Sequence, residues 1–146
     1  FHKMIELNGK VFLTWDDIEE QVDNLANQIS KMDKKPFYIY GVPRGGAIPA
    51  VWLSHKTGIK YQQINSSQIS KVADLSHVLI VDDICDSGET IQKLKEDFPK
   101  CITATLYHKE TAIDKPDIYG EISTYDWLYF PWENQESSEI RDNTYE

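Results

Sequence analysis

A largely apolar run from His77 to Val81 ends at two adjacent aspartates, and this junction constrains the fold more than any other segment. An uninterrupted run of this kind is typical of a strand in a parallel sheet that is covered on both faces. We expect a loop at Asp82–Ser87 and then an amphipathic helix at Gly88–Phe98, closed by Pro99. Because ligands bind beyond the carboxyl ends of parallel strands, the sequence predicts a binding site at this junction.

The other periodic segments extend this pattern into an alternation of strands and helices. A helix at Thr14–Ser30 is indicated by an apolar stripe at helical spacing: Ile18, Val22, Leu25 and Ile29. The further predicted elements are strands at Phe37–Val42, Ile59–Ile64, Ile102–Tyr107, Ile118–Ile122 and Trp127–Phe130, and a helix at Ala47–Lys56. Strands that alternate with helices predict an α/β fold, a three-layer open and mostly parallel sheet flanked by helices.

Length and charge narrow the possible classes of protein. The 146 residues are enough for one domain, so we expect a single domain over 1–146 whose last part, 133–146, is a polar acidic tail. The formal net charge of -9 argues against nucleic acid or an anionic membrane as a partner, since both attract basic surfaces. The chain shows no run of about 18 apolar residues and no leader, and Cys85 and Cys101 lack a metal or disulfide spacing, which favours a cytoplasmic protein.

The segment Asp82–Thr90 carries chemistry that suits a phosphorylated sugar. It contains three aspartates, a serine, a threonine and a glycine at the start of a predicted helix. The free N–H groups of a helix N-terminus bind anions, whereas carboxylates suit ribose hydroxyls or a magnesium ion. A strand end followed by an Asp N-cap would explain one or two of the acids, but not the whole set. The pattern therefore favours a ligand site over a purely structural turn.

A second loop, Pro43–Gly46, follows the preceding predicted strand. Gly45 and Gly46 allow the backbone to approach a ligand closely. Arg44, one of two arginines in the chain, offers phosphate oxygens a planar and permanently charged fork. Alone, this segment would be read as a turn between a strand and a helix. Its place at the end of the neighbouring strand, about forty residues before the aspartate pair, favours phosphate binding.

A third candidate region combines Lys109 with the aromatic-rich segment Trp127–Glu133. A purine requires an aromatic face for stacking and a hydrogen-bond donor for its 6-oxygen. Taken alone, Trp127 and Phe130 would be core residues and Lys109 a solvated lysine. Beside the two phosphate motifs, the region favours a purine pocket.

These motifs resemble those of the type I phosphoribosyltransferases. The tripeptides that begin at Thr14 and at Pro131 further resemble the bacterial xanthine-guanine and hypoxanthine phosphoribosyltransferases, and the likeness covers most of Leu13–Glu133. It implies the fold of that family, with a small hood beside the main sheet. It also implies a purine base and phosphoribosyl diphosphate as substrates, Mg2+ as cofactor, and a homodimer or homotetramer.

The resemblance assigns roles on the phosphate side. Asp86 is the candidate general acid or base of catalysis. Asp82 and Asp83 contact the ribose hydroxyls, directly or through Mg2+, and are the candidate metal ligands. The other residues matched to phosphoribosyl diphosphate binding are Arg44, Gly45, Gly46, Ser87, Gly88, Glu89 and Thr90.

On the purine side, the resemblance implies three contacts. Lys109 binds the 6-oxygen, Trp127 stacks on the base, and Leu128 reads the 2-position through its backbone carbonyl. The implied reaction joins guanine, xanthine or hypoxanthine to phosphoribosyl diphosphate and gives a nucleoside 5'-monophosphate and pyrophosphate.

The chain also departs from the family's pattern. Glu89 stands where purine members often have glycine, and Pro43 where many have serine. The connection Asn65–Ser76 is shorter than the mobile loop that closes the site in the family. These departures keep open an alternative, a non-catalytic regulatory protein that binds nucleotide or phosphoribosyl diphosphate. A phosphoacceptor receiver domain is disfavoured, because its acidic pair follows the first strand and the Pro43–Gly46 loop would have no role.

Overall fold

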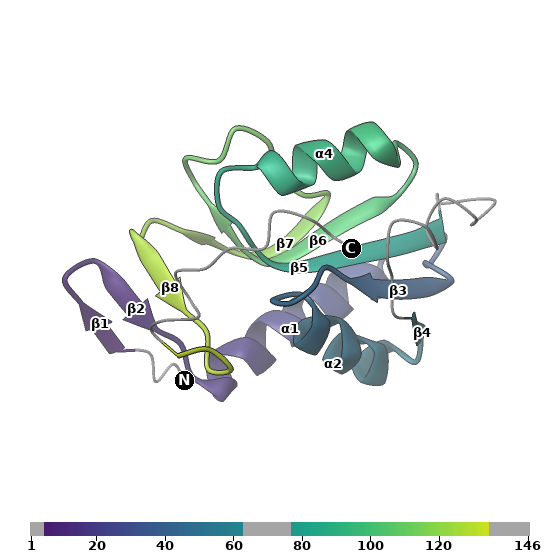
Figure 1. The fold of residues 1–146 in the computed structure, drawn as a ribbon. Helices are drawn as coiled ribbons and strands as arrows, with labels where there is room; N and C mark the ends of the chain where they lie inside the picture. The colour runs from purple at the N-terminus through teal and green to yellow at the C-terminus, as the bar shows by residue number, and fades with distance from the viewer. Residues whose placement is uncertain (1–4, 63–76, 135–146) are drawn as a thin grey trace.

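The main sheet of this computed structural model, which describes residues 5–62 and 77–134, is parallel throughout. Its strands run in the order β4 (Lys60–Gln62), β3 (Tyr38–Gly41), β5 (Val78–Cys85), β6 (Ile102–Lys109) and β7 (Ile118–Ser123). Helices α1 (Trp15–Ser30) and α2 (Ala47–Thr57) lie below the sheet in Figure 1, and α4 (Glu89–Asp97) lies above it. This arrangement confirms the predicted three-layer α/β fold. The shortened lid expected at Asn65–Ser76 and residues 135–146 of the tail lie outside the described residues.

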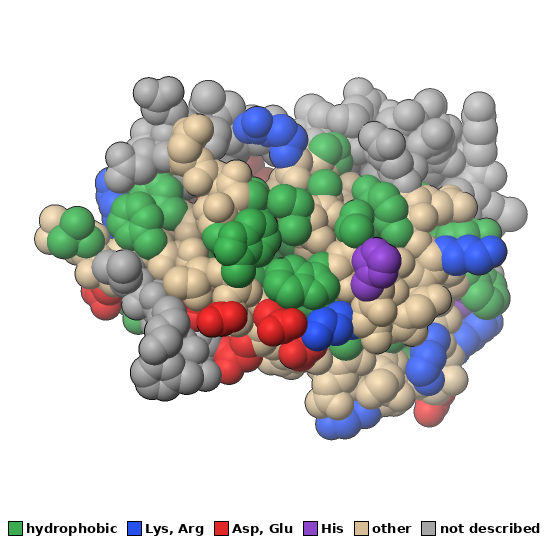
Figure 2. Space-filling model, turned by 90° about the horizontal axis from the view of Figure 1, so that it is seen from below, with side chains coloured by type: hydrophobic (Ala, Val, Ile, Leu, Met, Phe, Trp, Pro, Cys, Tyr) green, Lys and Arg blue, Asp and Glu red, His purple; other side chains and the backbone are tan. Residues whose placement is uncertain are grey.

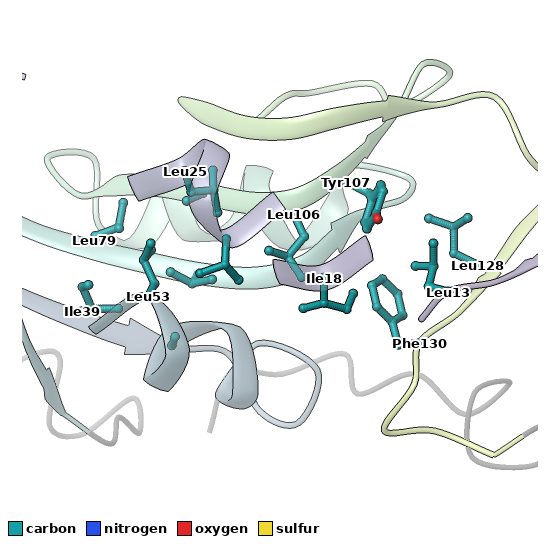
Figure 3. Close-up of a cluster of buried hydrophobic side chains, with 14 of the residues drawn as sticks. Leu13, Ile18, Leu25, Ile39, Leu53, Leu79, Leu106, Tyr107, Leu128 and Phe130 are labelled. Carbon is teal, nitrogen blue, oxygen red and sulfur yellow. The ribbon is translucent and has the colours of Figure 1, made fainter. Parts of the chain in front are cut away.

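Helix α1 forms where its cap and its apolar stripe predict. The Thr14 Oγ1 accepts the Asp17 backbone N–H at 3.2 Å, while an Asp17 carboxylate oxygen accepts the Thr14 N–H at 2.8 Å. This reciprocal capping box satisfies two of the N–H groups that a helix start leaves unpaired. The stripe side chains, Ile18 and Leu25 among them, are buried against the sheet (Figure 3).

Helix α2 connects the second predicted loop to β4. It ends at Gly58, whose φ of +77° is the left-handed conformation that glycine adopts without strain. Its outer face exposes Ile48 and Val51, and α1 exposes Trp15 beside it. Figure 2 shows hydrophobic side chains gathered on this lower face of the molecule, with acidic side chains along one border. None of the helices within 5–62 and 77–134 has the length and apolar character required to cross a membrane.

Strand β5 is longer than predicted. We expected a loop from Asp82, but the strand continues to Cys85 because β6 extends beside it, with Asp82 opposite Thr105 and Cys85 opposite His108. The strand end was therefore placed four residues too early. The aspartate pair lies in the carboxyl-terminal half of β5. The sheet therefore fixes the backbone from which both side chains project.

A small second sheet completes the hood that the resemblance implies. β1 (Ile5–Leu7) and β2 (Lys10–Phe12) form a hairpin, and β8 (Trp127–Tyr129) pairs with β2 in parallel. The turn is Asn8-Gly9, with φ values of +55° and +77°. Asn-Gly between alternating strands is a strong hairpin signal, so the hairpin, which we did not predict, was readable in the sequence. Through Leu128 and the following Phe130, this sheet joins the main core (Figure 3).

Candidate active site

A cleft of about 330 Å³ lies at the carboxyl ends of β3 and β5. It joins the two segments that the sequence singled out for phosphate binding. The predicted residues that line it are Arg44, Gly45, Asp82, Asp83, Asp86, Ser87, Gly88, Glu89 and Thr90. Every residue predicted on the phosphate side except Gly46 therefore borders one cavity.

The two segments meet because β3 and β5 are neighbours in the sheet. Gly41 lies opposite Val81, and the Val42 backbone N–H donates to the Val81 carbonyl at 2.8 Å. The chain then turns, with the Gly46 N–H donating to the Val42 carbonyl at 2.8 Å. Both loops consequently leave the sheet side by side, at the edge where a parallel sheet binds ligands.

Two glycines permit this close approach. A Cβ atom on Gly45 would collide with the Asp83 carboxylate, and one on Gly46 would collide with the Val81 carbonyl oxygen. Gly46 does not line the cleft, so its part is to let the loop pack on β5. The peptide bond between Pro43 and Arg44 is cis.

The aspartate pair differs in exposure. Asp83 is 5% exposed and lies against Gly45, whereas Asp82 is partly exposed. An oxygen of each carboxylate accepts the backbone N–H of the next residue, Asp83 and Ile84, at 2.8 Å in both cases. Both residues line the cleft. The pair thus offers carboxylate oxygens to a ligand from a rigid strand.

The donor set suits a magnesium ion that arrives with a diphosphate. Among the residues that the structure describes, no group of three or more His, Cys, Asp or Glu side chains is arranged to hold a metal. Mg2+ is ordinarily bound by one or two carboxylates together with substrate phosphates and water. Asp82 and Asp83 supply that number of carboxylates and fit this mode, but not a metal held by protein alone.

The loop between β5 and α4 presents the start of a helix to the cleft. Gly88 caps α4 with φ at +92°, and the Glu89 N–H donates to the Ser87 Oγ at 3.2 Å. Glu89 stands where purine members of the family often have glycine, so its side chain must point away from a phosphate bound to the backbone. The Glu89 side chain is exposed, in agreement with this requirement. The nine-residue helix adds the positive end of its dipole, which favours an anion here.

Cys85 also lines the cleft, between Asp83 and Asp86 in the sequence. Burial, with a smaller contribution from the charge of Asp82, raises the pKa of its thiol to about 11. The Sγ donates to the Asp114 carbonyl at 3.1 Å. At neutral pH the group is therefore a neutral thiol and a weak nucleophile.

Asp86 connects the phosphate side to the base side. Its carboxylate lies 3.4 Å from the Lys109 Nζ, and the same ammonium donates to the Asp126 carbonyl at 3.3 Å. Lys109 does not itself line the cleft. The ion pair nevertheless places Lys109, which we expect to bind the purine 6-oxygen, next to Asp86, the candidate general acid or base.

The other two predicted purine contacts lie in the hood. Trp127 is partly exposed and pairs with Lys10 at the edge of β8. Leu128 is 3% exposed, lies opposite Val11, and belongs to the core. Neither residue is in the lining of the 330 Å³ cleft. The structure thus unites Asp86 and Lys109 with the phosphate residues and leaves Trp127 and Leu128 outside that cavity.

Residues that we did not predict as ligand contacts also border the cleft, among them Ile48, Trp132 and Glu133. Trp132 stacks on Phe130 with ring centroids 5.1 Å apart and an interplanar angle of 18°. The Glu133 Oε1 accepts the Phe130 N–H at 2.9 Å, which fixes the turn after β8. The signal available in the sequence was the Pro-Trp-Glu tripeptide, which we used only as a mark of resemblance.

Comparisons with known proteins agree with this architecture. The xanthine-guanine phosphoribosyltransferase of Cereibacter sphaeroides is 30% identical over 113 residues, which are 65% of this chain and 68% of that protein. The crystal structure of a purine phosphoribosyltransferase from Pyrococcus horikoshii has a TM-score of 0.70 and 32% identity, covering 86% of this chain and 95% of its own. The Helicobacter pylori xanthine-guanine-hypoxanthine phosphoribosyltransferase shares the fold, with a TM-score of 0.71 and 24% identity over 86% of this chain and 93% of its own. No family model matches the chain.

Proposed function

The chain belongs to the purine phosphoribosyltransferases of type I fold, and from that premise we propose that it couples guanine, xanthine or hypoxanthine to phosphoribosyl diphosphate. The products are a nucleoside 5'-monophosphate and pyrophosphate, as in purine salvage. The observation that carries the proposal is the single cleft bordered by Arg44, the aspartate pair and the loop before α4.

In the proposed reaction, a ring nitrogen of the purine bonds to the first carbon of the ribose as the bond from that carbon to the diphosphate oxygen breaks. Positive charge develops on the sugar, and negative charge leaves with pyrophosphate. Arg44 and the backbone N–H groups of its loop face the departing charge, and the N–H groups at the start of α4 hold the 5'-phosphate. The proton that the purine nitrogen loses or gains passes through Asp86. The remaining contribution of the protein is orientation of the two substrates.

Mg2+ is proposed as the cofactor, held by Asp82 and Asp83 together with the diphosphate. When bound, it would neutralise the charge of the diphosphate oxygens. The strand position of the pair supports this assignment, because the sheet and the backbone hydrogen bonds already orient both carboxylates.

On the base side, we propose that Lys109 binds the purine 6-oxygen, that Trp127 stacks on the ring, and that the Leu128 carbonyl reads the 2-position. The contact of Lys109 with Asp86 supports the first assignment, because it lies where a base must meet the ribose carbon. We further propose a cytoplasmic homodimer or homotetramer, and light scattering on the purified protein tests the assembly. A monomer at micromolar concentration would contradict it.

The function is tested by incubating the protein with each base, phosphoribosyl diphosphate and Mg2+. Chromatography then measures the nucleotide formed. We expect nucleotide from at least one of the three oxopurines, with a turnover number in the ordinary range of about 1 to 1000 per second. Adenine and the pyrimidine bases serve as controls. Absence of product with every purine and pyrimidine base would overturn the proposal.

The alternative, a regulatory protein that binds without turnover, makes a separable prediction. Calorimetry would detect binding of nucleotide or phosphoribosyl diphosphate while the assay finds no product. It is motivated by Glu89 at the start of α4 and by the short connection Asn65–Ser76.

A further inference from the structure

The loop that faces the proposed 5'-phosphate rests on a distant segment of the chain, Ile113–Lys115. The Ile113 backbone N–H donates to the Ser87 carbonyl at 2.9 Å. A Cβ atom on Gly88 would lie 2.7 Å from the Asp114 nitrogen, so the two backbones are already in contact. The shape of the phosphate loop therefore depends on where this segment lies.

Asp114 and Lys95 hold the segment in place. The Nζ of Lys95, in the last turn of α4, lies 3.2 Å from an Asp114 carboxylate oxygen and donates to the Lys115 carbonyl at 2.8 Å. The same Asp114 oxygen accepts the Lys115 N–H at 2.9 Å, and the Asp114 carbonyl accepts the Cys85 thiol at 3.1 Å. One aspartate thus ties α4, the end of β5 and the phosphate loop together.

Packing contributes little on the outer side of the segment. A recess of about 510 Å³ lies there, lined by His108, Tyr119 and Ile122 together with the segment itself. Ile113 is 74% exposed. Because few apolar contacts restrain the segment from outside, the polar contacts of Lys95 have a larger share in fixing its position.

We propose that Lys95 and Asp114 are positioning residues for phosphoribosyl diphosphate: their ion pair sets the conformation of the Ser87–Gly88 loop without touching the substrate. The identity of the ligand rests on the proposed function. The dependence of the Ser87–Gly88 loop on the Ile113–Lys115 segment rests on the hydrogen bonds and the ion pair between them and α4. A purely structural ion pair would change stability alone, whereas a positioning pair changes affinity for one substrate.

The experiment compares two lysines in similar settings. Lys95→Met removes the pair with Asp114, and Lys56→Met removes pairs with Glu19 at 3.3 Å and Asp23 at 3.0 Å on the far side of the sheet. The two lysine side chains are 36% and 33% exposed. We expect Lys95→Met to raise the KM for phosphoribosyl diphosphate about threefold to fivefold, the upper part of the range that one partly exposed charged pair can produce, with kcat and the KM for purine unchanged. Lys56→Met should change none of the three, and Lys95→Arg should restore most of the affinity.

A second measurement does not require catalysis. Hydrogen exchange of the peptide that covers Asp86–Ile91 should quicken in Lys95→Met and stay unchanged in Lys56→Met. An unaltered KM together with unaltered exchange would overturn the proposal, as would equal effects from the two lysines. If the wild-type protein forms no nucleotide, the proposed function fails, while the exchange data still decide whether Lys95 holds the loop.

Discussion

On the phosphate side of the cleft, the proposed ligand groups come from two short segments, Arg44–Gly45 and Asp82–Thr90, that leave adjacent strands of one sheet. On the base side they come from Lys109, at the end of β6, and from β8, which belongs to the hood. The first side is fixed by the register of the sheet and by glycine packing, whereas the second side requires two sheets to be correctly placed.

This difference predicts how substitutions will act. A change on the phosphate side should weaken phosphoribosyl diphosphate binding equally for every base, because that substrate is common to all reactions. A change on the base side should alter the ranking of the bases and leave phosphoribosyl diphosphate unaffected. Asp86 and Lys109, joined by their 3.4 Å ion pair, are the point at which the two sides meet.

The largest effect is expected at that meeting point, from Asp86→Asn. The amide cannot accept and return the purine proton, so kcat should fall about 10²- to 10⁴-fold, while the KM for phosphoribosyl diphosphate changes little. The loss should be the same for each base that is a substrate. Steady-state kinetics measure it, with Asp16→Asn, an exposed aspartate in the first turn of α1, as the control. Full activity in Asp86→Asn would remove its assigned role.

Gly45→Ala tests whether the phosphate side depends on close packing. The added methyl group would collide with the Asp83 carboxylate, and overpacking of this kind costs about 1–3 kcal/mol. We expect the KM for phosphoribosyl diphosphate to rise about fivefold to a hundredfold with every base.

The matched control is Gly58→Ala, where nothing lies within 4 Å of the added atom but φ is +77°. Its left-handed strain should cost about 1 kcal/mol of stability and leave KM unchanged. Calorimetric melting and kinetics on both variants separate the effects. An equal change in KM for the two alanines would contradict the packing argument.

The sequence predicted that the residues of the phosphate side would lie together, because the information that places them is local. The strand, the aspartates, the loop and the helix of Val78–Asp97 are consecutive, and the capping box and apolar stripe of α1 are too. The end of β5 was misplaced because it depends on pairing with β6, whose residues lie about twenty positions later. β5 continues as far as β6 pairs with it, beyond the end of its other neighbour β3, and its own residues do not reveal that length.

The base side was less predictable for the same physical reason. Trp132 follows β8 and reaches the cleft only when the hood is in place, whereas the ion pair of Asp86 with Lys109 follows from the pairing of β5 with β6, in which Cys85 lies opposite His108. No local spacing relates these residues, so only a likeness to known proteins could suggest Lys109 and Trp127. The Asn8-Gly9 turn was the one local signal for the hood, and it identified a hairpin without its partner β8.

Trp127→Leu tests the base side. Loss of ring stacking removes about 0.5–1.5 kcal/mol, so the KM for the purine should rise about twofold to tenfold while that for phosphoribosyl diphosphate stays constant. The control is Trp52→Leu, a partly exposed tryptophan on α2 that packs against Trp15 with ring centroids 6.3 Å apart. If both substrates weaken together, or if neither does, Trp127 is not the stacking residue.

The smallest effect concerns two buried thiols at opposite edges of the sheet. Cys85 lines the cleft, Cys101 precedes β6 at the opposite edge of the sheet, and burial raises the pKa of each to about 11. At pH 8 about one thiol in a thousand is ionised, so iodoacetamide should react slowly with both and reach them through local opening. Phosphoribosyl diphosphate at a concentration equal to its Kd should slow Cys85 about twofold and leave Cys101 unchanged, because it stabilises only the closed phosphate loop. A purine alone should protect neither, as its proposed contacts lie on the base side. Mass spectrometry of the alkylated peptides measures both rates in one sample. Equal protection of the two thiols would mean that the ligand stabilises the whole fold. The phosphate side and the base side would then not act independently.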